Sequence, residues 1–169
     1  MHSDSPILIV IFGLPGTGKT TFATVLSNQL GVKHFNTDII RSLSNESQQY
    51  DEENKASIYD EMLHLTRLEF EKGKNVIVDA TFYKKKLRER FKVLAQEYDA
   101  TVKWIEVCAG EEVVKKRVSK KRRYSEADYA VYQMIKSQFE PMQEEYMQLF
   151  SDQEEISGLI EKAVKFIKQ

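Results

Sequence analysis

Short apolar stretches alternate with amphipathic stretches along this chain. A continuous apolar, β-branched run is typical of a strand buried on both faces, and residues 7–12 (ILIVIF) form the longest such run. Shorter runs predict further strands at 32–36, 75–81 and 102–109, and a marginal fifth strand at 147–151.

Apolar residues spaced by three and four positions predict helices between these strands. Leu87, Phe91 and Leu94 mark one helix, and Gly31 and Gly73 each end another. The expected helices span residues 17–30, 38–43, 54–72, 87–98, 111–121, 127–140 and 156–167.

Strands that alternate with helices predict a parallel sheet with helices on both faces, which is a three-layer α/β fold. The polar segment 44–53 (SNESQQYDEE) is expected to be a loop. Because neither an internal repeat nor a linker rich in Pro, Gly and Ser divides the chain, we expect a single domain over residues 1–169.

Residues 13–20 (GLPGTGKT) match the pattern G-x-x-x-x-G-K-[ST] and lie between a predicted buried strand and a predicted helix. Glycines let the backbone turn its N–H groups toward phosphate oxygens, and the helix N-terminus adds positive potential. We expect Lys19 to hold the β- and γ-phosphates of ATP and Thr20 to ligate Mg²⁺. The predicted nucleotide-binding residues are Gly13, Leu14, Pro15, Gly16, Thr17, Gly18, Lys19, Thr20 and Thr21.

The sequence TDIIR follows the second predicted strand, at the edge of the sheet where open α/β folds bind their ligands. Asp38 and Arg41 are three residues apart, so one helical turn places them on the same face. A carboxylate there can deprotonate an acceptor hydroxyl, and an arginine can hold an anionic group of the acceptor. In the structural alternative, Thr37 or Asp38 only caps the short helix and Arg41 is a solvated surface charge.

Asp79 ends the third predicted strand. A Walker-B aspartate has this position, and it orders Mg²⁺ directly or through water. The structural alternative is a helix cap, because many α/β strands end in aspartate.

Residues 115–123 (KKRVSKKRR) hold seven basic residues in nine. We expect a basic lid over approximately residues 115–128, with an arginine that meets the charge developing on a transferred phosphoryl group. Arg117, Arg122 and Arg123 are the candidates, and the last two are favoured because they lie where helix passes into loop. The alternatives are a solvated helix face and a nucleic-acid-binding patch.

A second basic cluster follows Asp79, and we expect its side chains on the outer face of a helix that packs through Leu87 and Phe91. These basic residues are Lys84, Lys85, Lys86, Arg88 and Arg90. The three histidines lack metal-ligand spacing, so they are assigned no function.

The composition narrows the classes of function. Lys and Arg total 25 and Asp and Glu total 26, and this balance disfavours a protein that binds nucleic acid through a generally basic surface. The longest apolar run is far shorter than the roughly 20 residues of a membrane-spanning helix, and it lacks the flanks of a signal peptide. The single cysteine, Cys108, cannot form an internal disulfide, so we expect a packing residue in a cytoplasmic protein.

Together these motifs resemble P-loop kinases of the polynucleotide-kinase-like and zeta-toxin-like branch, which includes AAA-type predicted kinases. The resemblance runs through GLPGTGKTTFA, TDIIR, NVIVDATF, the basic lid and YSEADYAVYQMIKSQFEPM. It implies the sheet order 2-3-1-4-5, a general base at Asp38, a contact of Arg41 with an acceptor phosphate, and a lid arginine at Arg122 or Arg123.

The leading hypothesis is an ATP-dependent phosphotransferase that moves the γ-phosphate of Mg-ATP to a hydroxyl of a small molecule or nucleoside. One alternative is a 5′-hydroxyl polynucleotide kinase, which the near-zero net charge makes the less favoured enzyme. The non-enzyme alternative is a nucleotide-binding switch or adaptor that hydrolyses ATP slowly.

Overall fold

The strands of the computed structural model, which describes residues 5–43, 52–120 and 126–169, form one parallel sheet in the order β2-β3-β1-β4-β5. The strands are β1 (Ile7–Phe12), β2 (Lys33–Asn36), β3 (Val76–Asp79), β4 (Thr101–Cys108) and β5 (Tyr146–Phe150). The helices are α1 (Lys19–Leu30), α2 (Thr37–Leu43), α3 (Glu52–Phe70), α4 (Lys85–Glu97), α5 (Glu111–Lys120), α6 (Glu126–Gln138) and α7 (Ile156–Ile167). The predicted three-layer fold, its sheet order and its marginal fifth strand are confirmed.

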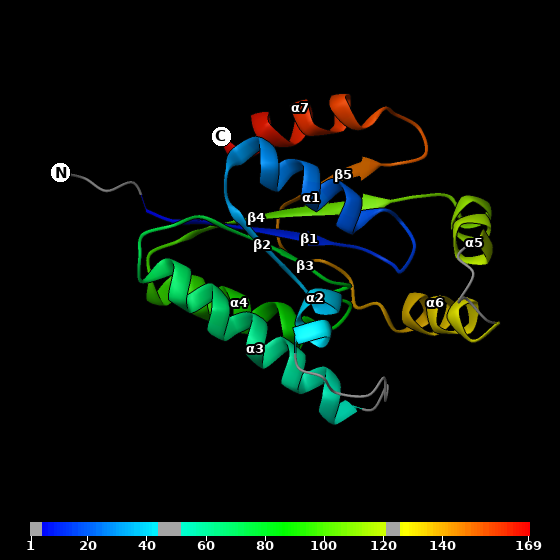
Figure 1. Ribbon diagram of the computed structural model, residues 1–169, viewed down its shortest axis with the longest axis horizontal. Coiled ribbons are helices and arrows are strands. Elements are labelled where there is room, and N and C mark those ends of the chain that lie inside the picture. The colour runs from blue at the N-terminus through cyan, green and yellow to red at the C-terminus, as the bar shows by residue number, and fades with distance from the viewer. Residues whose placement is uncertain (1–4, 44–51, 121–125) are drawn as a thin grey trace.

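Helices cover both faces of the sheet, with α1 and α7 on one face and α3 and α4 on the other (Figure 1). The central position of β1 in the sheet explains why its sequence is apolar throughout. Leu8, Val10 and Phe12 enter the core beneath α3 and α4, while Ile9 and Ile11 enter the core beneath α1 and α7. A strand buried on both faces has no polar side to show.

The pair α5 and α6 lies beyond the carboxyl end of the sheet (Figure 1). A small separate core joins the two helices, made of Val114, Val118 and Tyr132, and Leu14 packs against it from the loop after β1. The helices that flank the predicted lid therefore rest on the phosphate loop. None of the helices in the described part of the chain is long and apolar enough to cross a membrane.

Most element boundaries differ from the predicted ones by one or two residues. α1 begins at Lys19 instead of residue 17, because the preceding residues form the loop. β3 ends at Asp79 instead of residue 81, because its pairing with β1 and with β2 ends there, and Phe82 then adopts a left-handed backbone with φ of 47°. α3 begins at Glu52, inside the segment expected to be a loop, of which residues 44–51 lie outside the described residues.

Two valine substitutions test the role of β1. Val10 is buried in the central strand, whereas Val93 is exposed on α4. We expect Val10→Ala to lower the free energy of unfolding by about 2 kcal/mol through lost burial and a residual cavity. Val93→Ala, the same chemical change, is expected to alter it by less than about 0.5 kcal/mol. Urea denaturation of both variants measures the difference, and equal losses would contradict this assignment of the core.

Candidate active site

The loop from Gly13 to Gly18 joins β1 to α1, and its glycines meet close neighbours. A Cβ on Gly13, where φ is 143°, would lie 2.5 Å from the carbonyl oxygen of Val107. A Cβ on Gly16 would lie 3.0 Å from Val114 of α5. β4 packs against Gly13 and α5 packs against Gly16, so a side chain at either position would displace the loop.

Lys19, at the first position of α1, is 9% exposed, and its Nζ donates a hydrogen bond of 2.7 Å to the carbonyl of Leu14. The Thr17 hydroxyl donates to the same carbonyl at 3.0 Å. Burial lowers the pKa of the Lys19 ammonium, and the negative charges of Asp79 and Asp38 partly oppose that effect. Three predicted site residues therefore meet at one edge of the sheet.

Asp79 lies 2% exposed at the end of β3. His34 Nε2 is 3.1 Å from Asp79 Oδ2. Because a carboxylate only accepts hydrogen bonds, the N–H of His34 is the donor. The Asn36 side-chain amide also donates to Oδ2, at 3.4 Å. Both partners come from β2, the strand paired with β3 in the register Asn36 to Asp79.

Asn36 links three parts of the site, although the sequence analysis gave it no role. Besides Asp79, its Nδ2 donates to the Thr20 hydroxyl at 3.3 Å. Its Oδ1 accepts the N–H of Ile39 at 2.7 Å, so Asn36 caps α2. The predicted cap at Thr37 or Asp38 is therefore wrong. Asparagine before a helix is a preferred N-cap, so the sequence held a signal for that contact. The contact of Asn36 with Asp79 comes from strand pairing, and its contact with Thr20 comes from the packing of α1 beside β2.

Asp38 lies in the first turn of α2 and is exposed. An exposed carboxylate near the Lys19 ammonium is accessible to an incoming hydroxyl, as a general base must be. Arg41 lies one turn further along α2, and its side chain is outside the described residues.

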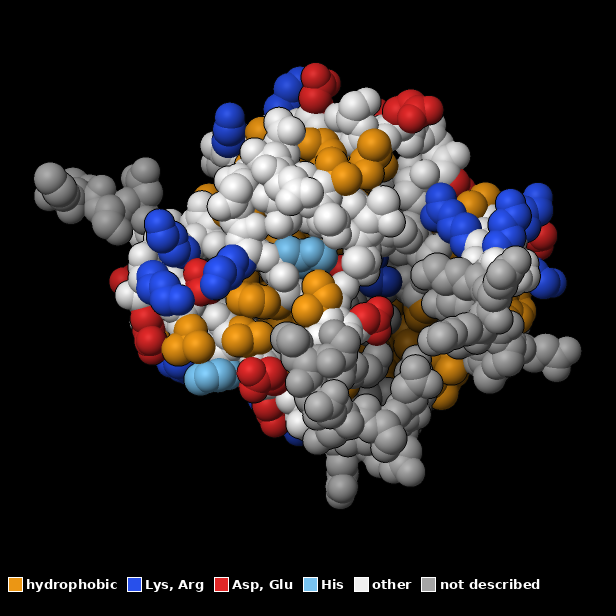
Figure 2. All heavy atoms as spheres, viewed as in Figure 1, with side chains coloured by type: hydrophobic (Ala, Val, Ile, Leu, Met, Phe, Trp, Pro, Cys, Tyr) orange, Lys and Arg blue, Asp and Glu red, His pale blue; other side chains and the backbone are white. Residues whose placement is uncertain are grey.

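The basic lid is described in part. Lys and Arg side chains gather over α5 at one side of the molecule (Figure 2). Arg122 and Arg123 lie outside the described residues. Arg117, which the sequence analysis ranked behind them, donates from Nη1 to the Thr17 carbonyl at 3.2 Å and to the Ser151 hydroxyl at 3.0 Å.

Ser151, after β5, completes this contact by donating to the same Thr17 carbonyl at 2.6 Å. The phosphate loop is thus held from outside by α5 and by the end of β5. Ser151 carries no sequence signal, because it follows the marginal strand and belongs to no motif.

One residue of the second basic cluster does not lie where its sequence context predicted. Arg88, expected on the outer face of its helix, is instead completely buried. Its neighbour Arg90 is half-exposed and pairs with Asp60.

Cys108 is half-buried, and burial, together with the charge of Glu106, raises the pKa of its thiol to about 12. A thiol that stays protonated at neutral pH is a packing group and not a nucleophile.

The donor set at this edge fits Mg²⁺. Thr20 offers an exposed hydroxyl and Asp79 a carboxylate, and both are hard oxygen donors. Mg²⁺ usually keeps several waters and takes one or two protein ligands together with substrate phosphates. Within the described residues, no three His, Cys, Asp or Glu side chains are grouped to hold a metal.

The buried charge of Lys19 gives a stability prediction for the nucleotide-free protein. We expect Lys19→Met to unfold at higher urea near pH 7, because methionine avoids the desolvation that lowers the lysine pKa below its ordinary 10.5. Between the lowered pKa and 10.5 the unfolded chain binds more protons, so wild-type stability rises with pH and the difference shrinks near pH 10. A Lys19→Met variant less stable than wild type at both pH values would contradict this.

The contacts of Asn36 give a second prediction. Asn36→Ala removes the cap of α2 and the amide shared with Thr20 and Asp79, so we expect a loss of about 1–3 kcal/mol in the free energy of unfolding. Asn28→Ala, on the exposed face of α1, is the matched control and should change it by less than about 0.5 kcal/mol. Chemical denaturation of the two variants measures the difference. Indistinguishable midpoints would show that the contacts of Asn36 do not stabilise the fold.

Comparison with known proteins agrees with this geometry. The crystal structure of APE1195 is 22% identical, with a TM-score of 0.80 over 98% of this chain and 96% of that one. The APS kinase CysC of Mycobacterium tuberculosis, in complex with AMPPNP and APS, is 15% identical, with a TM-score of 0.77 over 98% and 99%. A gluconokinase from Sinorhizobium meliloti 1021 is 13% identical, with a TM-score of 0.72 over 96% and 92%. These likenesses establish the fold.

No curated protein matches this chain in sequence. The family model described as "AAA domain" matches residues 8–142, a segment that runs from β1 through the phosphate loop and past the end of α6. Since that segment contains most of the chain and the whole of the candidate site, this chain belongs to the AAA domain family.

Proposed function

We propose that this protein is an ATP-dependent phosphotransferase that moves the γ-phosphate of Mg-ATP to a hydroxyl group. The observation that carries the proposal is the buried Lys19 ammonium, which lies in a phosphate loop within the electrostatic reach of Asp79 and Asp38. A slow hydrolase or a simple binder needs the lysine and the metal-side carboxylate. A second, exposed carboxylate at the same edge suits a group that must accept a proton.

On the nucleotide side, Lys19 would leave the Leu14 carbonyl and bind the β- and γ-phosphates, while the N–H groups of the loop surround their oxygens. The buried Lys19 ammonium would then have a phosphate oxygen as a directly bonded anionic partner. Thr20 and Asp79 would hold Mg²⁺, which neutralises charge on the phosphates. His34 and Asn36 keep Asp79 oriented, because both donate to the same carboxylate oxygen.

On the acceptor side, Asp38 takes the proton of the attacking hydroxyl while the hydroxyl oxygen bonds to the γ-phosphorus. The bond from the γ-phosphorus to ADP breaks, and ADP departs in line. Arg41, on the same helix, would hold an anionic group of the acceptor. Arg122 or Arg123 would meet the charge on the transferred phosphoryl group, and closure of the lid would exclude water.

We further propose a small molecule or nucleoside as the acceptor. The near-zero net charge of the chain supports this choice over a polynucleotide. The structure of the APS kinase of similar fold is a complex with two small molecules, AMPPNP and APS. A 5′-hydroxyl polynucleotide kinase is the second candidate, favoured by the basic residues of α5.

Transfer from γ-labelled ATP to pooled acceptors tests the proposal. The pool contains nucleosides, sugars, aminoglycosides and short 5′-hydroxyl RNA and DNA, and Lys19→Met provides the blank. We expect Asp38→Asn to lower transfer at least about 100-fold while ATP affinity stays within about twofold, because a general base acts only in the chemical step.

Asp60→Asn, which alters a surface pair with Arg90, is the matched control and should transfer like wild type. Full transfer by Asp38→Asn would remove the general base from the proposal. Labelling that is confined to oligonucleotides and weakens steeply with salt would favour the polynucleotide kinase. ATP binding without any labelled acceptor would favour a nucleotide-dependent switch.

A further inference from the structure

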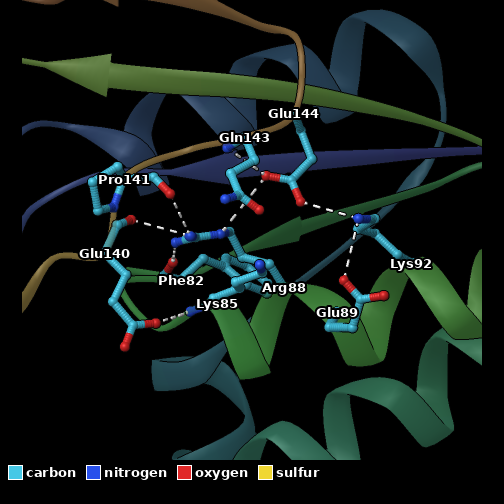
Figure 3. Close-up of polar contacts among 9 residues, drawn as sticks. All are labelled: Phe82, Lys85, Arg88, Glu89, Lys92, Glu140, Pro141, Gln143 and Glu144. Atoms are coloured by element: carbon cyan, nitrogen blue, oxygen red, sulfur yellow. Dashed lines mark hydrogen bonds and ion pairs between the residues drawn. The ribbon is translucent and has the colours of Figure 1, made fainter.

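Arg88 of α4 is completely buried, which is exceptional for an arginine, and its side chain reaches backbone carbonyls in two distant segments (Figure 3). Nη1 donates to the carbonyl of Phe82 at 2.9 Å. Nη2 donates to the carbonyls of Glu140 and Pro141, at 3.0 Å each. One planar fork therefore joins the chain after β3 to the chain that leaves α6.

Arginine suits this position for a chemical reason. The three carbonyls lie outside regular helix and strand, so each needs a donor from elsewhere in the molecule. A guanidinium supplies several N–H donors in one plane and keeps its charge when buried. Lysine keeps the charge but has no planar fork, and an apolar side chain would leave the three carbonyls unpaired.

Two acidic residues on the same segment complete the junction. Glu144 Oε2 is 4.0 Å from Arg88 Nε and its other oxygen is 3.2 Å from Lys92, so the buried charge has a partner. Glu140 accepts the backbone N–H of Lys85 at the start of α4, and its own N–H donates to the Tyr83 carbonyl at 2.8 Å. Figure 3 shows these groups gathered around Arg88.

The segment that Arg88 holds begins at the candidate site. Asp79 ends β3, and the next residue, Ala80, donates its N–H to the Ile11 carbonyl at 3.2 Å. Phe82 has a positive φ of 47° and is held on both sides, by Arg88 at its carbonyl and by the Tyr59 hydroxyl at its N–H. Residues 79–82 are therefore fixed at one end by β1 and at the other by Arg88.

The other segment leads to the phosphate loop. It follows α6, whose Tyr132 packs with Val114 and Val118 of α5 in the small core that Leu14 joins. Arg88 therefore joins the segment that follows Asp79 to the segment that follows α6. Among the described residues, its side chain makes no hydrogen bond with Lys19 or Asp38.

We propose that Arg88 is a positioning residue for phosphoryl transfer: it fixes residues 79–82 against the chain leaving α6 and so sets the Asp79 carboxylate, on the metal side of the site, relative to the phosphate loop. This inference rests on the proposed function. It goes beyond it by assigning to a buried arginine, remote from the reacting groups, control of the transfer step and not of nucleotide binding.

The test compares Arg88→Lys and Arg88→Met with Arg90→Lys and Arg90→Met, two controls on the same helix. Steady-state kinetics with the pooled acceptors gives kcat and the KM for ATP, and hydrogen exchange reports on 79–83, 139–144 and β1. We expect both Arg88 variants to lose exchange protection at 79–83 and 139–144 while β1 stays protected. We expect kcat to fall at least about tenfold with the KM for ATP within about twofold, since a small misplacement of reacting groups slows the chemical step.

Three results would overturn the proposal. One is wild-type kcat in Arg88→Lys, and another is an equal fall in kcat in the Arg90 variants. The third is loss of β1 protection together with ATP binding even in Arg88→Lys, which would make Arg88 a general core residue. If the wild-type protein labels no acceptor, the proposed function fails, and unchanged exchange in the Arg88 variants would then show separately that Arg88 does not hold the two segments.

Discussion

The charge of Lys19 is the constraint to which the rest of the site responds. An ammonium this deeply buried is costly, and in the nucleotide-free protein it has one hydrogen bond, to the Leu14 carbonyl, and two carboxylates within electrostatic reach. Each of the three comes from the carboxyl edge of the parallel sheet. Burial that disfavours a lone cation favours its pairing with an anion, so the feature that is costly for folding suits the phosphate binding proposed above.

Parallel pairing then determines how that edge is organised. Because Asn36 and Asp79 are register partners on β2 and β3, the Asn36 amide reaches the Asp79 carboxylate, and the same side chain also contacts the Thr20 hydroxyl and the first turn of α2. Residues of three separate motifs are thereby held by a single buried side chain. The segment that matches the AAA domain model contains the phosphate loop, and His34 and Asn36 show how this chain orients Asp79 beside that loop.

A second buried cation, Arg88, has a different place in the fold. Lys19 has few partners and faces the site, whereas Arg88 has three carbonyls and an acidic neighbour and faces the core. The contrast follows from chemistry. A guanidinium whose two Nη atoms donate to three carbonyls rigidifies the segments that it joins, whereas a buried ammonium with few anionic partners is suited to binding an anionic ligand.

The sequence by itself determined the layer architecture, the phosphate loop and the aspartates at two strand ends, because each depends on a local pattern of apolar residues, glycines and charges. It also placed the fifth strand, β5, within one residue. Tertiary structure alone decided the functions of Asn36, His34, Arg117 and Ser151, whose contacts cross between elements. Periodicity even predicted the wrong environment for Arg88, since a helical pattern shows which side of a helix is mainly apolar. It does not show that carbonyls more than 50 residues away need a donor on that side.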